Sequence, residues 1–352
     1  MKKIIILLFT LTLTILPSCS QVVKISANDA VALALKNNLA LQAKRKEIDI
    51  MKQEVKMADA LKNPQVQSNI LTGSIGKANS SQVGLALPVE IAKRGVRKKA
   101  AIANMRLVES QVRQAELDLK IKVMSAYFDV VYMKSVVAIL QPREELYKNM
   151  KVLAELKPKN SQNYEIEKLQ ADIRHKKQII LLNKAKANLL YAQFHLNDTL
   201  NLQDNSVMYD AREDSLFQEH ITLLDIDLPE YKVIEDVAMK FSYSIRIAED
   251  NIEKSQKELS VAKHKVIPDI TVAGGYAYSN DGKANGAFIG GFVDVPMLYT
   301  YRPEVNRAKI VYERTKIDKL SFENKLKFAL KEDYNQFKYA KENMNYYKDI
   351  LS

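Results

Sequence analysis

The chain carries one pattern twice, and a repeat of this length constrains architecture more than any single motif does. The first copy runs from about residue 26 to residue 197, and the second begins near residue 230. Each copy opens with an amphipathic helical stretch, continues through two strand-like runs around a turn, and ends in a long helical stretch. The prolines that bracket the strand-like runs are Pro64 and Pro88 in the first copy and Pro268 and Pro296 in the second. The matching order predicts two copies of one structural unit.

The strand-like runs predict two β-hairpins, at residues 65–88 and 269–296, because turn residues separate β-prone segments. In the first hairpin Val66 and Ile70 share one side, and the opposite side is polar or small. The second is mixed, with Ile270, Val272, Tyr276 and Tyr278 on one side and Asp294 late in its final strand. A transmembrane barrel requires this alternation, and a half-buried sheet of a soluble protein shows it too.

Four strand segments in one chain are too few to close a membrane barrel, which needs about eight. An open sheet edge in lipid would leave backbone groups unpaired at a cost of several kcal/mol each. Two chains would supply about eight strands, and a barrel of that size fills its own interior. We therefore expect three chains, which would supply about twelve strands.

The helical stretches predict a long antiparallel coiled coil. The first helix of this coiled coil, expected over residues 92–156, would span roughly 100 Å if unbroken. We expect Pro142 to kink it or to end its first part. A return helix, 164–197, shows a seven-residue period, which implies a left-handed supercoil. The residues with this period are Ile166, Ile173, Ile180, Ala187 and Phe194. The tip between these helices consists of Lys157, Pro158, Lys159 and Asn160.

Composition agrees with a mainly α-helical fold that has a small β part. Among 352 residues there are only 10 glycines and 9 prolines, and 27% of the chain is charged. The net charge is +11, but Lys and Glu alternate along the helical stretches and form no block of like charges. This pattern indicates solvated helix faces and not a nucleic-acid-binding surface. The acidic stretch 198–230 is expected to connect the first repeat, 19–197, to the second, 231–352.

The N-terminus predicts export. Lys2 and Lys3 precede an apolar run, 4–16, that is too short to span a membrane comfortably, and together they describe a signal peptide over residues 1–18. Cys19, the only cysteine, follows at once and resembles the acylated cysteine of a bacterial lipobox. The alternative is a signal peptide cut nearby, with Cys19 lost or without a role.

Catalytic and metal-binding patterns are not found in the sequence. The four histidines are scattered, and there is neither a phosphate-binding loop nor a nucleophile beside a base. We expect no enzyme activity, cofactor or metal, and we interpret His175 and His264 as surface residues of helices. The candidate functional residues lie instead at the tip and at two strand-to-helix elbows, where Arg94 and Arg97 either bind lipid headgroups or are simply solvated. The elbow residues are Pro88, Arg94, Gly95, Arg97, Pro296 and Arg302.

The order helix, hairpin, long helical arm and return helix resembles the TolC family of outer-membrane efflux proteins. The local matches are residues 32–41, 87–97 and 295–298, and the stretch from Pro88 to Arg97 is similar to the heavy-metal efflux branch. The resemblance implies a homotrimer with a β-barrel in the outer membrane of a Gram-negative-type bacterium and a helical tunnel in the periplasm. It also implies a passive conduit that docks on a periplasmic adaptor and on an inner-membrane pump of the RND or ABC type.

The second copy departs from this pattern. About 70 residues separate Pro88 from Pro158, whereas 56 residues follow Pro296. We expect the second tip and the last helix to be missing, through a truncated gene or a short variant, which would leave apolar residues uncovered. These residues are Ile317, Leu320, Phe328 and Tyr339. The alternative functions are a periplasmic adaptor, which would need more β sequence, and a coiled-coil envelope lipoprotein.

Overall fold

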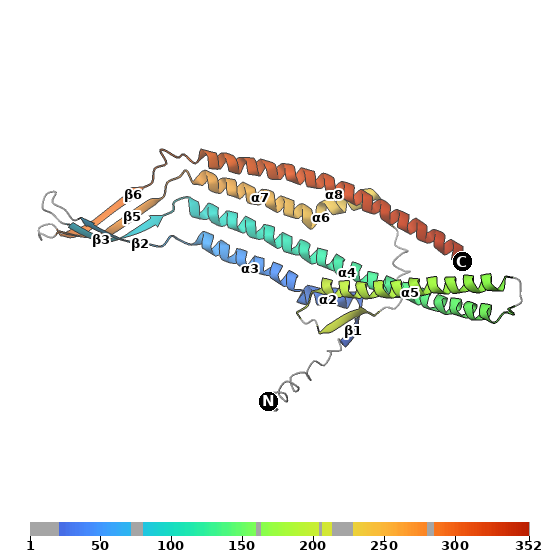
Figure 1. Ribbon diagram of the computed structural model, residues 1–352. Helices are drawn as coiled ribbons and strands as arrows, with labels where there is room; N and C mark the ends of the chain where they lie inside the picture. The colour runs from blue at the N-terminus through green and yellow to red at the C-terminus, as the bar shows by residue number, and fades with distance from the viewer. Residues whose placement is uncertain are drawn as a thin grey trace, which may run out of the picture. The chain divides into compact units, whose positions relative to one another are not determined.

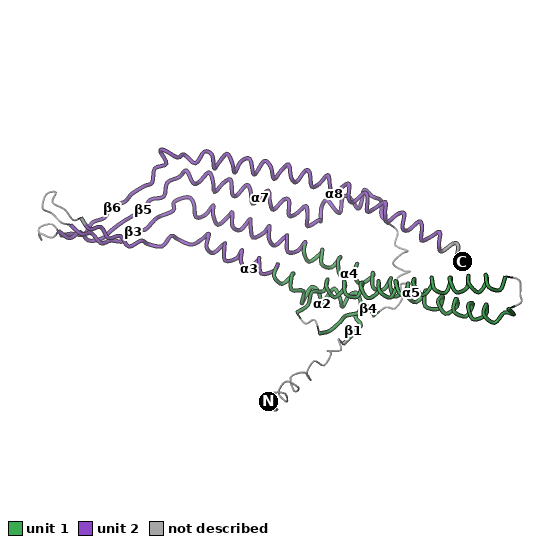
Figure 2. The backbone as a smooth tube through the Cα atoms, viewed as in Figure 1, with its two compact units in different colours: residues 1–43, 115–227 green, residues 44–114, 228–352 purple. Residues whose placement is uncertain are grey.

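The computed structural model of the protein describes residues 21–71, 80–159, 163–203, 206–212, 228–279 and 285–351. The chain divides into two compact units, coloured in Figure 2: residues 1–43 with 115–227, and residues 44–114 with 228–352. The expected signal peptide, 1–18, lies outside the described residues. So do Cys19, Asn160 and His220.

The first unit contains a two-stranded sheet in which β1 (Gln21–Ile25) and β4 (Val207–Ala211) pair in parallel. Around it lie α2 (Ala27–Asn37), the later part of α4 (Lys93–Glu155) and α5 (Tyr164–Leu200). Strand β4 falls within the segment that was expected only to connect the repeats. The core that these elements share consists of Ile25, Ala30, Ala34, Val123, Ala126, Tyr127, Val130, Val131, Leu196, Leu200 and Ala211.

Polar contacts attach the small sheet to α4. The Tyr127 hydroxyl donates to the carbonyl oxygen of Ile25 at 2.9 Å, and Lys134 Nζ lies 2.8 Å from Asp210 Oδ2, with both side chains nearly buried. The central part of α4 is apolar enough by composition to cross a membrane. Its residues Tyr127 and Val130 are fully buried in this core, so we assign the helix to the helical body.

The repeat is visible in the backbone. In the first copy α2 leads to α3 (Leu39–Asp59) through Asn38, and in the second α6 (Tyr231–Phe241) leads to α7 (Tyr243–His264) through Ser242. The two linking residues have nearly the same conformation, with φ −61° and ψ 122° at Asn38 and φ −63° and ψ 126° at Ser242. Helices α2 and α6 are both 11 residues long. The backbone therefore supports the repeat seen in the sequence.

The second unit contains a four-stranded antiparallel sheet in the order β2-β3-β5-β6. Its strands are β2 (Gln65–Leu71), β3 (Ser80–Val89), β5 (Ile270–Ser279) and β6 (Gly286–Val293). The strands lie at one end of this unit, and α3, the first part of α4, α7 and α8 (Arg302–Leu351) run from them (Figure 1). Both expected hairpins are present, and they join through β3 and β5 into one sheet.

Helix α4 does not end at Pro142. It continues to Glu155 with the proline inside it. The turns beyond the proline are held to α5 by a hydrogen bond between His175 and Glu144 at 2.7 Å and by an ion pair between Lys151 and Asp172 at 2.7 Å. His175 is thus a part-buried partner of Glu144 and not a solvated surface residue.

Helix α5 packs with a seven-residue period, but the residues that pack inside the chain are not those that the sequence predicts. Ile166, Ile180 and Phe194 are exposed. The side of α5 that packs within the unit also follows a seven-residue period, with small and polar side chains at several positions: Ala171, His175, Gln178, Leu182, Ala185, Leu189, Ala192 and Leu196. Small residues let paired helices approach closely. Because small and polar residues do not look like core residues, the packed side is hard to recognise in the sequence. Helix α5 therefore carries a second, more apolar side that nothing in the described chain covers.

Candidate functional site

One face of the four-stranded sheet is apolar and open. Strand pairing places Val66, Leu85 and Ile289 in one row across the sheet. Val66 is 76% exposed and Ile289 is 86% exposed. Other members of the same face are also exposed: Ile70, Val83, Leu87, Val89, Ile270, Val272, Tyr276, Tyr278 and Val293. A surface this apolar over four strands is not that of a sheet facing water.

The opposite face carries small and polar side chains, among them Gln67, Asn69 and Gln82. Gly84 and Gly275 face each other across β3 and β5. A Cβ at Gly275 would collide with the carbonyl oxygen of Val83, and one at Gly84 would lie 3.0 Å from the ring of Phe288. The two glycines thus let the strands and this ring pack closely on the small-residue face. The sheet alternates between an apolar face and a face of mostly small or polar residues, on which Phe288 and Phe292 of β6 are exceptions. This alternation is of the kind that a membrane barrel needs.

The first elbow consists of residues 90–92, between β3 and α4. Pro88 does not end the strand, because β3 continues through Val89 and Pro88 lies opposite Thr271 of β5. Strand β2 pairs with β3 only as far as Gln65 opposite Ala86. Pro88 therefore pairs with β5 alone. Its missing N–H group is tolerated because β2 does not extend opposite it.

Arg94 and Arg97 donate hydrogen bonds to backbone carbonyl groups at the C-terminal end of α3. Arg94 Nε donates to the carbonyl oxygen of Asp59 at 2.7 Å. Arg97 donates to the carbonyl oxygens of Ala58 and Ala60 at 2.9 and 3.1 Å. The last carbonyl groups of a helix lack partners within the helix, and cationic side chains satisfy them well. Neither arginine is simply solvated, and both join the elbow to the helix that precedes β2.

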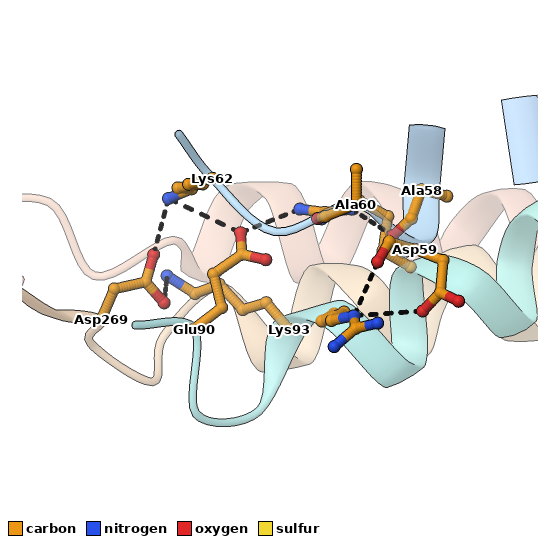
Figure 3. A network of polar contacts seen from close by, with 9 residues as sticks. Ala58, Asp59, Ala60, Lys62, Glu90, Lys93 and Asp269 are labelled. Atoms are coloured by element: carbon orange, nitrogen blue, oxygen red, sulfur yellow. Dashed lines mark hydrogen bonds and ion pairs between the residues drawn. The ribbon is translucent and has the colours of Figure 1, made fainter. Parts of the chain in front are cut away.

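A network of charges surrounds this elbow (Figure 3). The side chain of Glu90 is only 5% exposed, and its Oε1 atom lies 2.8 Å from Arg97 Nη1 and 3.5 Å from Lys62 Nζ. Lys62 also contacts Asp269 Oδ2 at 3.1 Å, and Lys93 contacts Asp269 Oδ1 at 3.2 Å. Burial raises the pKa of Asp269, but the two lysines outweigh it and hold this pKa below the ordinary value. The network connects the elbow to the start of β5.

The second elbow consists of residues 294–301, between β6 and α8. Its side chains Val295, Met297 and Leu298 are exposed. Pro296 follows the strand, Arg302 begins α8, and Tyr301 has a positive φ of 56°. Lys265 Nζ lies 2.6 Å from Glu304 Oε2, with both side chains substantially exposed.

Gly95 of the first copy lies in the first turn of α4, with open space beside it.

The tip of the α4–α5 hairpin is the third candidate. Lys157 Nζ lies 2.6 Å from Glu167 Oε2 on α5, whereas Pro158 and Lys159 are exposed. A groove of about 300 Å³ lies next to this ion pair between the two helices. Its lining includes Tyr147, Met150, Leu153, Gln170 and Arg174. The groove combines apolar and charged side chains, as protein-binding surfaces do.

Metal chemistry gains no support from the described part of the chain, where no group of three or more His, Cys, Asp or Glu side chains could hold a metal ion. The sites that the sequence singled out fall into separate places. The elbow residues of each copy cluster at a strand-to-helix junction, and the tip residues lie in the other unit. Sequence reasoning missed Glu90, Lys62 and Asp269, although the charged residues beside Pro64, Pro88 and Pro268 were a signal for them.

Comparison with solved structures gives consistent likenesses. The outer-membrane channel CmeC of Campylobacter jejuni matches with a TM-score of 0.68 and 17% identity, over 92% of this chain and 74% of that one. The open-state outer-membrane channel MtrE of Neisseria gonorrhoeae matches with a TM-score of 0.68 and 15% identity, over 92% and 75%. CusC, which is described as forming a transmembrane channel, matches with a TM-score of 0.63 and 15% identity, over 88% and 74%.

No protein-family model and no curated protein matches the sequence. The structural likenesses nevertheless cover 92% of this chain. The chain therefore has the fold of the TolC-like outer-membrane channels, which confirms the fold class that the repeated order of elements predicted.

Proposed function

We propose that this chain is one subunit of a homotrimeric outer-membrane efflux conduit that acts passively. The observation that carries the proposal is the exposed apolar face of the four-stranded sheet, with Ile289 86% exposed at its outer strand. Contact of such a face with lipid acyl chains avoids the unfavourable free energy of exposing it to water. The structural neighbours are outer-membrane channels, which supports the same function.

The edges of the sheet require further copies of the chain. Strands β2 and β6 are the outer strands, and each pairs on one side only. In a membrane, their free backbone groups would be unpaired at several kcal/mol each. Pairing β6 of one copy with β2 of the next, three times around, closes a barrel of about twelve strands and removes every edge. The exposed apolar side of α5 would then pack against helices of a neighbouring copy.

The remaining assignments follow from this architecture. The helical body extends into the periplasm of a Gram-negative-type bacterium, and an acylated Cys19 adds a lipid anchor. The tip residues Lys157, Pro158 and Lys159, with the groove beside them, contact a periplasmic adaptor. The adaptor links the conduit to an inner-membrane pump of the RND or ABC type, which selects the cargo and supplies the energy. Catalysis has no part in this function.

Interchain cross-linking tests the barrel. Ser68→Cys in β2 is combined in turn with Ala287→Cys, Ile289→Cys and Gly291→Cys in β6, and the membrane fraction is treated with a short bis-maleimide. We expect covalent dimers and trimers only when both cysteines are present, and a detergent-solubilised particle with the mass of three chains. The matched control pairs Ser81→Cys with Tyr278→Cys, which face each other within one chain and should yield a cross-linked monomer. A water-soluble monomer in every case would refute the proposal.

A further inference from the structure

The second elbow is built differently from the first and exposes a small apolar surface. It has eight residues, 294–301, whereas the first has three, 90–92. Leu298 is fully exposed and Met297 is 81% exposed. A segment that water alone surrounds gains nothing from two large apolar side chains at its most exposed point. These residues therefore point to a partner that contacts this elbow.

The surface of this elbow continues the apolar face of the sheet. Val293, the last residue of β6, lies opposite Ile270, and Ile270 lies opposite Val89. All three belong to the apolar face, so the elbow leaves the sheet directly after a residue of that face. The Met297 N–H then donates to the carbonyl oxygen of Val295 at 2.8 Å. This turn carries the chain away from the strand with Met297 and Leu298 outermost.

A polar margin follows immediately. The rings of Tyr299 and Tyr301 meet edge to face, 5.1 Å apart, and the Tyr299 hydroxyl donates to Glu304. Lys265 pairs with the same carboxylate, and Arg302 begins α8. Apolar side chains, then tyrosines with a polar end, then cations is the order found where a protein passes from acyl chains to lipid headgroups.

We propose that the second elbow inserts into the periplasm-facing leaflet of the membrane. Met297 and Leu298 insert among the acyl chains, and Tyr299, Tyr301 and Arg302 lie at the headgroups. The first elbow offers less apolar surface: Ile91 is exposed, but the charged side chains of this elbow pair with α3 and with the start of β5. Each subunit thus contacts the leaflet mainly through its second elbow. The inference rests on the proposed outer-membrane conduit.

Depth-dependent fluorescence quenching tests the proposal on the full chain, which contains no tryptophan. Leu298→Trp is compared with Ile289→Trp on the apolar sheet face and with Phe328→Trp, an exposed apolar position on α8. Each variant is reconstituted in phosphatidylethanolamine–phosphatidylglycerol vesicles that contain lipids brominated near the headgroup or near the chain ends. Met297→Trp provides a second reading if Leu298→Trp does not assemble.

We expect bromine near the headgroup to quench Leu298→Trp by about half, bromine near the chain ends to quench it less, and Phe328→Trp to change little. If Ile289→Trp is quenched and neither Leu298→Trp nor Met297→Trp is, a neighbouring subunit covers the elbow, and this inference fails while the conduit stands. If Ile289→Trp is also unquenched, the conduit itself fails. Equal quenching of Phe328→Trp would overturn the inference as well, because the elbow would then not differ from the helical body.

Discussion

The two elbows perform the same structural task, the change from strand to helix, with opposite chemistry. The first is short, and Arg94, Arg97 and Glu90 bind it to the end of α3. The second is longer, has a single exposed ion pair between Lys265 and Glu304, and displays apolar side chains. The charges of the first elbow pair with groups of the same chain, although Glu90 Oε2 is buried without a hydrogen bond. A junction that leaves apolar groups open depends on its surroundings, and the repeat lets one chain have both.

The comparison predicts that the largest loss of stability follows from Arg97→Ala. This change removes a donor from the carbonyl group of Ala58 in α3 and one from that of Ala60 just after it. It also leaves the nearly buried Glu90 with Lys62 at 3.5 Å. We expect the free energy of unfolding to fall by about 2–4 kcal/mol, measured by guanidinium denaturation followed by circular dichroism. Lys99→Ala, at an exposed position of the same helix, is the control. A loss no larger than that of the control would show that the first elbow is not held by this arginine.

Arg94→Ala is expected to have a smaller effect, about 1 kcal/mol. Arg94 is about half exposed, and Asp59 keeps its contact with Lys98 at 2.8 Å when Arg94 is removed. The same denaturation experiment on Arg94→Ala, Asp59→Ala and the double variant measures the coupling between these residues. Strict additivity of the two single effects would contradict the contact.

Acid should weaken the first elbow through Asp59. The hydrogen bond from Lys98, with the charge of Arg94, holds the pKa of Asp59 below its ordinary value of 3.8. The stability that this carboxylate adds is thus complete above the ordinary value and is lost as the pH falls through the lowered folded value. Asp59→Asn should flatten the decline of stability below about pH 5. Asp236→Asn, on an exposed helix face, should leave the pH profile of the parent protein in place, and an identical profile for both variants would contradict the assignment.

The smallest effect is expected in the second elbow. Glu304→Ala removes the ion pair with Lys265, and exposed pairs of this kind contribute little because water and salt screen them. We expect the free energy of unfolding in detergent to change less than with Arg97→Ala or Arg94→Ala. A loss comparable to that of Arg97→Ala would abolish the contrast between the elbows.

The fold followed from features with a clear physical period. Alternation in the strands, the prolines around the hairpins and the repeat of helix lengths all appear in the structure. Side-chain partners were harder to predict. Arg94 and Arg97 were read as solvated or lipid-bound because their acceptors, the carbonyl groups of Ala58 and Asp59, belong to the backbone and leave no mark in a sequence.

Other differences have similar causes. The packed side of α5 was overlooked because Gln178 and Ala185 look unlike core residues, and the exposed isoleucines looked more like them. Strand β4 was overlooked because it is short and lies in an acidic segment, although Val207 and Tyr209 are β-prone. His175 was read as a surface residue because Glu144 lies far from it in sequence, on another helix.

The parallel pairing of β1 with β4 has a consequence for the order of events. Gln21 finds its partner only at Val207, after α4 and α5 have been made and have turned back on each other. Pairing across so long a stretch is slow, because the loop must close before any contact compensates for the lost entropy. Strand β1 consequently stays undocked until the first helical arm has folded.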